Sequence, residues 1–293
     1  MPLGKLRWLG EELIAVGLDP NELSRVEILA SRHGHRVVRV WLESRSFILK
    51  SFPSRSEVPT YNLLRDLGVP TLSLLASADR SMLLEDLAAS SGWHAAGSDD
   101  LRCAEAGEAV ARWYRILHDS GRQVAADPPD FLARDVDVLS SEGINELARA
   151  LQFADRPAMK RASESIEALK KGLQSLPQTL NHNDFYWTNL ALSRGDAPRR
   201  AVIYDYHLMG VGPACCDYRN VLSVLEGDAA AAFHGTYGSL PEEHFILDRP
   251  VATLYALHEA ARQPAFPRWA EGLVDQIRSG EFEENLRAAL SVL

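Results

Sequence analysis

The spacing of apolar residues changes near residue 87, and this change constrains the fold more than any single motif. Before that point, short apolar runs rich in β-branched residues are separated by tight turns, a pattern that predicts antiparallel strands. The strands are expected at 26–29, 37–42, 47–50, 72–76 and 81–85. Helical spacing predicts two helices in the same region, at 3–16 and 60–67. The first 87 residues are therefore expected to form a β-rich lobe.

Beyond residue 87 the apolar residues recur mainly with the helical period. Helices are expected at 101–118, 142–152 and 160–174, and again from residue 220 onward. One pair of strands, 188–192 and 201–206, interrupts these helices around a polar turn. The predicted fold is therefore α+β with two lobes, 1–87 and 88–293, and a ligand site is expected where the two lobes meet.

The charge of the chain limits the partners that it can have. The 293 residues include 31 basic and 40 acidic side chains, which gives a net charge of −9. Sequence-independent binding of nucleic acid needs a basic surface, so no nucleic-acid partner is expected. Residues 221–293 hold 11 of the acidic side chains but 5 of the basic ones. This excess indicates either an ordinary solvated surface or a site that attracts cations.

Cysteine content and hydropathy predict the compartment. The three cysteines, of which Cys215 and Cys216 are adjacent, cannot form a disulfide framework, and this indicates a reducing compartment. The first residues contain acidic side chains where a signal peptide needs an uninterrupted apolar run. No stretch approaches 18 apolar residues without a charge. We therefore expect a cytoplasmic protein without a membrane partner, and the sequence leaves the oligomeric state open.

The most informative motif is a polar segment with the pattern His-x-Asp-x-x-x-x-Asn. Its members are His182, Asp184 and Asn189. In phosphoryl transfer, an Asp accepts or orients the proton of the attacking hydroxyl, and an Asn amide oxygen binds the divalent metal on the nucleotide phosphates. The spacing alone is moderately specific. It predicts phosphoryl transfer only in combination with further residues.

Two further residues supply the remaining chemistry. Asp205 ends the second predicted strand of the interrupting pair, sixteen positions after Asn189, where both side chains can bind one metal ion. Lys50 ends the predicted strand 47–50, and from there its ammonium group can pair with nucleotide phosphates. A lysine at a strand end is usually a solvated edge residue. The presence of Asp184 and Asp205 favours the functional interpretation.

On these residues the chain resembles the aminoglycoside phosphotransferase and choline kinase family, whose members are related to the protein kinases. The catalytic loop of that family, typically His-Gly-Asp followed by four residues and Asn, is matched by His182-Asn183-Asp184 and Asn189. The family's metal-binding segment, typically Ile-Asp-Trp followed by Gly-Pro and a further Asp, has counterparts here in Ile203-Tyr204-Asp205-Tyr206, Gly212-Pro213 and Asp217. Further matches are 67–70, 83–87 and Leu117-His118, so the resemblance extends from about residue 20 to about residue 260.

The resemblance implies a bilobal, protein-kinase-like α+β fold. The N-terminal lobe is expected to hold a small antiparallel sheet and a helix, and the larger C-terminal lobe to be mainly helical, with a hinge at about 83–89. By the same resemblance Asp184 is the catalytic base, and Asn189 and Asp205 bind Mg²⁺. His182 and Asp217 are expected to support the catalytic loop.

The resemblance also assigns residues to nucleotide binding. Lys50 is expected to contact the phosphates, with Glu57 as its acidic partner. The backbone near Glu85 and Leu87 is expected to hold the adenine. Gly34 belongs to the turn 31–35, whose backbone amides are expected to cover the phosphates.

Several positions depart from the family's usual pattern. The phosphate turn has one glycine, Gly34, flanked by histidines. Asn183 replaces the glycine of the catalytic loop, and Asn is the non-glycine residue that tolerates a positive φ most readily. Tyr206 stands where the family commonly has Trp. Pro59 lies two residues after Glu57, so Glu57 is expected in the first helical turn or before it.

The function indicated is transfer of the γ-phosphoryl group of ATP to a hydroxyl of a small molecule, with Mg²⁺ as cofactor and GTP not excluded as donor. The acidic excess after residue 221 indicates a cationic, aminoglycoside-like acceptor, with candidate contacts Glu226, Asp228, Glu242 and Glu243. One alternative is a kinase of a small metabolite such as choline, ethanolamine, a sugar or an amino acid. Others are a nucleotide-binding regulator without transfer activity and a metal-dependent hydrolase that needs no acceptor.

Overall fold

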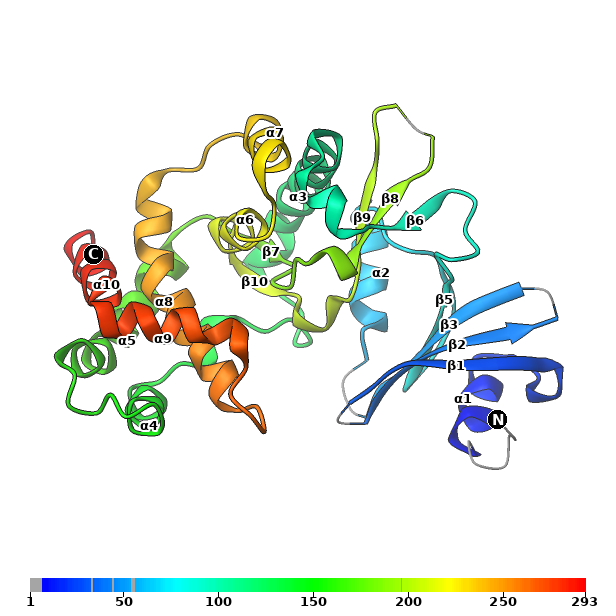
Figure 1. Cartoon of the computed structure of the whole chain (residues 1–293), viewed down its shortest axis with the longest axis horizontal. Coiled ribbons are helices and arrows are strands. Elements are labelled where there is room, and N and C mark those ends of the chain that lie inside the picture. The colour runs from blue at the N-terminus through cyan, green and yellow to red at the C-terminus, as the bar shows by residue number, and fades with distance from the viewer. Residues whose placement is uncertain (1–6, 33, 44, 54–55, 196) are drawn as a thin grey trace. The chain divides into compact units, whose positions relative to one another are not determined.

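The computed structural model describes residues 7–32, 34–43, 45–53, 56–195 and 197–293 (Figure 1). The chain divides into two compact units, each built from separate segments. Unit 1 contains the chain up to Ile116 together with Asp184–Leu208 and Val224–Tyr237. Unit 2 contains Leu117–Asn183, Met209–Ser223 and Gly238–Leu293. The division into lobes 1–87 and 88–293 remains a prediction.

A five-stranded antiparallel sheet forms the first part of unit 1. In chain order its strands are β1 (Leu23–Arg32), β2 (His35–Leu42), β3 (Arg45–Ser51), β4 (Leu74–Ala78) and β5 (Ser81–Glu85). Their order in the sheet is β1-β2-β3-β5-β4, so β3 has a partner on each side. Lys50 of β3 lies opposite Val37 of β2 and Met82 of β5. Pairing on both sides of β3 therefore fixes the position of the Lys50 backbone in the sheet.

The two faces of this sheet have different environments because side chains alternate along a strand. On one face, Val38 and Val40 pack with Leu9 and Leu13 of helix α1 (Arg7–Ala15) in an apolar cluster. Arg39, between the two valines, lines a cavity on the other face. Helix α2 (Val58–Asp66) follows β3 in the chain. The alternation of apolar and polar side chains along β2 thus places the valines on the core face of the sheet and Arg39 on the cavity face.

A second sheet in unit 1 brings distant parts of the chain together. Its strands are β6 (Trp93–Ala95), β8 (Leu190–Ser193) and β9 (Ala201–Ile203), in the order β6-β8-β9. Helix α3 (Ala104–Ala126) belongs to this unit up to Ile116, and helix α7 (Gly227–Tyr237) belongs to it entirely. Trp113 of α3 is buried, and its Nε1 donates to the carbonyl of Pro70 at 2.8 Å. This bond connects α3 to the segment that precedes β4.

Unit 2 is mainly helical. Its further helices are α4 (Ser141–Ala150), α5 (Pro157–Ser175), α6 (Cys215–Leu222), α8 (Glu242–Ala261), α9 (Glu271–Ser279) and α10 (Glu281–Ser291). Residues such as Leu147, Ile166, Leu254 and Phe282 form its apolar core. Two short antiparallel strands, β7 (Gln178–Asn181) and β10 (Gly210–Pro213), pair within this unit. Among the described residues, no helix is both long enough and apolar enough to cross a membrane.

The strands and helices predicted from spacing are present, with changed boundaries. Strands β1 and β2 continue to the pair Arg32 and His35 because their ladder extends that far, which shortens the predicted turn 31–35. His33 lies outside the described residues. The strands predicted at 188–192 and 201–206 are shorter, because Trp187–Asn189 and Tyr206–Leu208 are 3₁₀ turns. Strands β6, β7 and β10 were not predicted, since three or four residues carry little periodicity.

Candidate functional site

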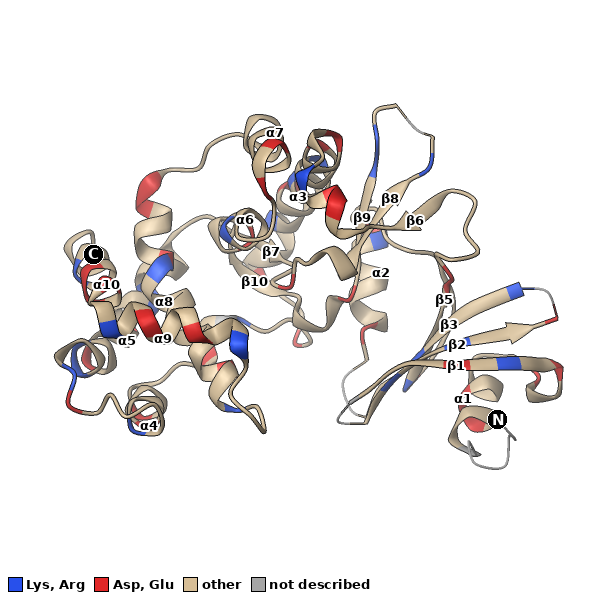
Figure 2. Cartoon of the chain, viewed as in Figure 1, with Lys and Arg blue, Asp and Glu red and all other residues tan. Residues whose placement is uncertain are grey.

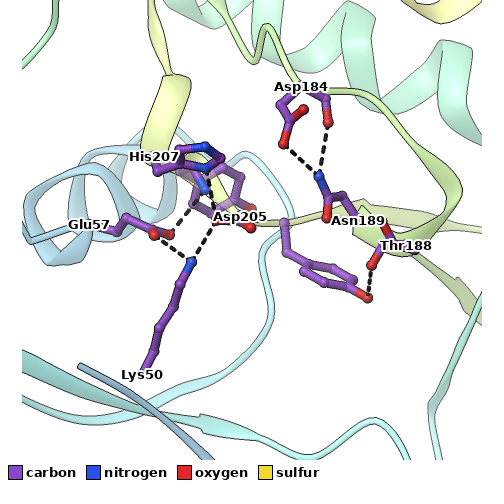
Figure 3. A network of polar contacts seen from close by, with 9 residues as sticks. Lys50, Glu57, Asp184, Thr188, Asn189, Asp205 and His207 are labelled. Carbon is purple, nitrogen blue, oxygen red and sulfur yellow. Dashed lines mark hydrogen bonds and ion pairs between the residues drawn. The ribbon is translucent and has the colours of Figure 1, made fainter. Parts of the chain in front are cut away.

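Lys50 lies at the centre of a partly buried charge cluster in unit 1 (Figure 3). Its side chain, 12% exposed, extends from β3 toward helix α2 and the segment after β9. The ammonium group forms an ion pair with Glu57 and donates to Oδ1 of Asp205 at 2.6 Å. Three residues that are far apart in the sequence therefore converge on one ammonium group.

Glu57 connects this ammonium group to the backbone beyond Asp205. It occupies the N-cap position of α2 and is 4% exposed. One of its oxygens accepts from Lys50, and the other accepts from the backbone N–H of Tyr206 at 3.1 Å. Pro59 is accommodated in the first turn of the helix, where its missing N–H costs no hydrogen bond. The Glu57 carboxylate thus positions both Lys50 and the segment that carries Asp205.

The charges in this cluster shift one another's pKa. Burial alone would lower the pKa of Lys50, but the negative charges of Glu57 and Asp205 outweigh it and raise that pKa. Burial alone would raise the pKa of Asp205, but a hydrogen bond from His207 and the charge of Lys50 lower it well below its usual value. Burial raises the pKa of Glu57, although Lys50 opposes the shift. Near neutral pH the cluster therefore holds a charged ammonium group beside the ionised Asp205.

Asp217 holds the backbone immediately before Asp184. This carboxylate is fully buried in unit 2 and accepts from the backbone N–H groups of His182 at 2.7 Å and of Asn183 at 2.8 Å. Asn183 has a φ of 67°, the left-handed conformation that Asn tolerates more readily than other non-glycine residues. The His182 side chain is also buried. This part of the chain therefore has a defined backbone geometry before it reaches Asp184.

Asn189 is oriented by Asp184 (Figure 3). Its Nδ2 donates to Oδ2 of Asp184 at 2.9 Å and to the carbonyl of Asp184 at 3.0 Å. Because both contacts use the amide nitrogen, the amide oxygen is the group left to bind a cation. Tyr204 fixes the same turn, since its N–H donates to the carbonyl of Asn189 at 2.9 Å and its hydroxyl to that of Thr188 at 2.7 Å. The catalytic-loop segment and the end of β9 are thus tied together at two points.

Asp205 and His207 follow β9 directly. Asp205 has a φ of 72°, an uncommon conformation for a residue with a side chain, and such residues cluster at functional sites. Nδ1 of His207 lies 3.0 Å from Oδ1 of Asp205. The hydrogen bond to Asp205 raises the pKa of His207 against the effect of burial. His207 was not predicted as a site residue, although its position two residues after Asp205 was a usable signal.

The oxygen donors of this region fit Mg²⁺. Ligand atoms of Asp184, Asp205 and His207 lie within 4.8 Å of one another. Magnesium is bound in proteins by one or two carboxylates together with other oxygen ligands, which the Asp184 and Asp205 carboxylates and the Asn189 amide oxygen provide. The residues predicted for metal binding are therefore chemically suited to that ion.

A cavity of about 470 Å³ lies beside Asp205 in unit 1. Lys50, Asp205, Glu85 and Leu87 are among its lining residues. Further lining side chains are apolar or aromatic: Val37, Ile48, Leu72, Leu84 and Tyr204. A cavity of this size with apolar walls and a few charged groups is typical of small-ligand sites. The predicted hinge residues and the charge cluster thus share one cavity.

Gly34 is not among the residues that line this cavity. It has a φ of 84°, and a Cβ there would lie 3.0 Å from Cβ of Pro53, so the turn requires glycine at this position. The neighbouring His33 lies outside the described residues. The part of Gly34 in covering phosphates remains a prediction.

The sequence matches the model of the phosphotransferase enzyme family over residues 25–255. The chain belongs to this family. The match includes every residue discussed above as a candidate for catalysis, metal binding or nucleotide binding. It confirms the resemblance that was noted on the sequence motifs. No curated protein matches the sequence.

Solved structures of similar fold include several kinases. Ethanolamine kinase from Plasmodium vivax is 12% identical with a TM-score of 0.62, covering 92% of this chain and 86% of the other. The GDP complex of a mutant aminoglycoside 2′-phosphotransferase is 12% identical with a TM-score of 0.64, covering 96% and 99%. A spectinomycin phosphotransferase in complex with ADP and spectinomycin is 12% identical with a TM-score of 0.54, covering 99% and 98%. These similarities confirm the predicted kinase-like α+β fold.

Proposed function

We propose that the protein is a kinase that transfers the γ-phosphoryl group of ATP to a hydroxyl of a small molecule. One observation carries this proposal: Asp184, Asn189, Asp205 and the ion pair of Lys50 with Glu57 lie in the same unit, in which Lys50 and Asp205 line a cavity of about 470 Å³. Catalysis of phosphoryl transfer consists mainly of positioning and of electrostatic stabilisation. Asp184 as a base, Asn189 and Asp205 as oxygen ligands, and the Lys50 ammonium group can together provide the positioning and the electrostatic stabilisation.

Each residue has a separate part in this reaction. Asp184 orients the acceptor hydroxyl and takes up its proton. Asn189 and Asp205 hold Mg²⁺, which when bound neutralises phosphate charge and orients the phosphates. Lys50, positioned by Glu57, adds a positive charge near the phosphates. Asp217 and His182 keep the loop before Asp184 in place.

The cavity receives the nucleotide in this proposal. Its apolar walls suit a purine ring, and Glu85 and Leu87, whose backbone is proposed to hold the base, are among its lining residues. The Glu85 side chain is engaged elsewhere, because Oε1 accepts from the backbone N–H and the hydroxyl of Ser73. Two of the structurally similar proteins were solved with ADP and with GDP. ATP is the proposed donor, and GTP is the alternative to be compared in the same assay.

The proposed acceptor is a small hydroxylated molecule, with amines tested first. Ethanolamine and the aminoglycosides, named for two of the similar proteins, are amines that carry hydroxyl groups. The acidic residues after 221 lie on α7, α8, α9 and α10, except for Glu226, which directly precedes α7 (Figure 2). Two of the suggested contacts form ion pairs within their own units, Glu226 with Arg102 at 2.8 Å and Glu242 with Arg249 at 2.7 Å. Two of the four suggested contacts are thus already paired with arginines, and the acidic excess gives weak support to a cationic acceptor.

A kinase of a small metabolite such as choline, ethanolamine, a sugar or an amino acid is the second candidate, with the same phosphoryl transfer and a different acceptor. A regulator without transfer activity is disfavoured, because a chain relieved of catalysis has no need of Asp184, Asn189 and Asp205 in one place. We further propose a cytoplasmic location, in which the three free cysteines stay reduced.

The experiment that tests the function combines binding with turnover. Thermal unfolding is measured with ATP or GTP, with and without Mg²⁺, and nucleotide hydrolysis is then followed over a panel of amino alcohols, aminoglycosides and sugars. We expect a magnesium-dependent stabilisation by nucleotide that Asp205→Asn loses. We also expect acceptor-dependent ADP formation that Asp184→Ala abolishes while nucleotide binding survives. Full transfer by Asp184→Ala contradicts the mechanism, and phosphate release that needs no acceptor indicates a hydrolase.

A further inference from the structure

His207 lies beside the proposed catalytic residues and has no part in the function proposed so far. Its Nδ1 is 3.0 Å from Oδ1 of Asp205, and its ring lies next to that carboxylate in Figure 3. One ligand atom each from Asp184, Asp205 and His207 lies within 4.8 Å of the others. An imidazole nitrogen therefore joins two carboxylates in a group compact enough for one ion.

The spacing of these atoms suits a first-row transition metal ion. Such an ion lies about 2.1 Å from an imidazole nitrogen or a carboxylate oxygen. Two ligands at right angles around it are then about 3 Å apart, as Nδ1 of His207 and Oδ1 of Asp205 are in the structure. Binding replaces the hydrogen bond between these atoms by two metal bonds.

The group is also accessible to an ion. The side chain of His207 is 45% exposed and that of Asp205 is 34% exposed. Lys50 and His207 both contact Oδ1 of Asp205, and within the described part of the chain no donor contacts Oδ2. Oδ2 of Asp205 is therefore available to keep the contact with Lys50 when Oδ1 binds the ion.

The chemistry of the ligands determines which ion is preferred. Mg²⁺ binds oxygen ligands and demands a regular octahedron of them. Imidazole suits first-row transition metals, and carboxylates suit Mn²⁺ as well as Mg²⁺. A set of two carboxylates and one imidazole thus favours a transition metal dication over Mg²⁺.

We propose that Asp184, Asp205 and His207 form a binding site for a first-row transition metal dication, and that His207 gives the site a preference for Mn²⁺ over Mg²⁺. The proposal rests on the proposed function to the extent that the ion occupies the same catalytic region. It concerns the chain without nucleotide and acceptor, in which Asp184 has no acceptor hydroxyl to orient. It concerns a residue that the expected magnesium pair, Asn189 and Asp205, leaves out.

The test is a titration of the full chain with Mn²⁺ in the absence of nucleotide. Free Mn²⁺ is quantified by its electron paramagnetic resonance signal for the wild type, for His207→Gln and for His258→Gln. His258 is a matched control because it is a partly exposed histidine in unit 2, away from the three ligands in the chain. We expect His207→Gln to weaken Mn²⁺ binding at least tenfold and His258→Gln to change it less than twofold. Displacement of Mn²⁺ by Mg²⁺ should need a lower concentration of Mg²⁺ in His207→Gln than in the wild type.

A spectroscopic measurement separates ligation from an indirect effect. Bound Mn²⁺ in the wild type should show nitrogen modulation in its electron spin echo, and His207→Gln should lack it, with circular dichroism confirming that the variant is folded. Equal Mn²⁺ affinity of wild type and His207→Gln, or absence of nitrogen coupling in the wild type, overturns the proposal. The thermal unfolding measurement with ATP distinguishes a failure of the metal-site proposal from a failure of the kinase proposal. Mn²⁺ binding without any nucleotide binding refutes the kinase function and leaves the metal site intact.

Discussion

Truncation of Glu57 should destabilise the protein more than truncation of an exposed glutamate. Glu57→Ala removes the carboxylate that accepts from Lys50 and from the backbone N–H of Tyr206, in a place where the side chain is 4% exposed. Breaking a buried ion pair typically costs about 3–5 kcal/mol, because the remaining charge is left without its partner. Lys50 keeps its contact with Asp205. We therefore expect the low end of this range, about 3 kcal/mol in the free energy of unfolding.

The measurement is urea unfolding followed by far-ultraviolet circular dichroism. Glu108→Ala is the matched control, since Glu108 pairs with Arg112 on the surface of α3 and is 46% exposed. Exposed pairs of this spacing contribute about 0.3–0.5 kcal/mol. The double variant Lys50→Met with Glu57→Ala should lose less stability than the sum of the two single changes, because the second change removes the orphaned charge.

A loss below about 0.5 kcal/mol in Glu57→Ala, equal to that of Glu108→Ala, would refute the reasoning. It would mean that the contacts of Glu57 with Lys50 and Tyr206 do not stabilise the fold. Additive effects in the double variant would contradict the inferred coupling between Lys50 and Glu57.

Three further predictions concern the same region and unit 2. Asn183→Gly should change the free energy of unfolding by less than about 0.5 kcal/mol from that of the wild type, whereas Asn183→Val should lower it by about 1–2 kcal/mol. The reason is the φ of 67° at this position, which glycine adopts without strain and valine does not. Urea unfolding of both variants tests this prediction. Tyr204→Phe loses the hydrogen bond to the Thr188 carbonyl. The variant should lower kcat about fivefold, equivalent to about 1 kcal/mol, and should change the KM for nucleotide by less than about twofold. Steady-state kinetics distinguish this result from a loss of nucleotide binding. A hydrogen bond with Cys215, together with burial, raises the pKa of Cys216 well above its usual value. Iodoacetamide at about pH 8 should therefore modify Cys216 at least tenfold more slowly than a free cysteine, as mass spectrometry of the labelled peptides would show.

The sequence predicted those features of the protein that depend on neighbouring residues. The change from alternating to helical spacing predicted the order of strands and helices, because each period reflects local backbone geometry. The His-x-Asp-x-x-x-x-Asn pattern and Asp205 indicated phosphoryl transfer, since these residue types supply a base and metal ligands in a fixed order. The sequence also indicated that Asn183 could replace glycine in the loop, because Asn tolerates a positive φ, and its φ is 67°.

The tertiary structure decided the features that depend on residues far apart in the chain. Strand β6 exists because Trp93–Ala95 finds a partner in β8, about one hundred residues later, and so short a segment has no strong preference of its own. Glu57 became a buried partner of Lys50 through the placement of α2. Lys50 contacts Asp205, which lies 155 positions later in the chain, and no local pattern of residues joins the two. Such contacts arise from long-range pairing and packing, whose energies a local pattern of residues does not contain.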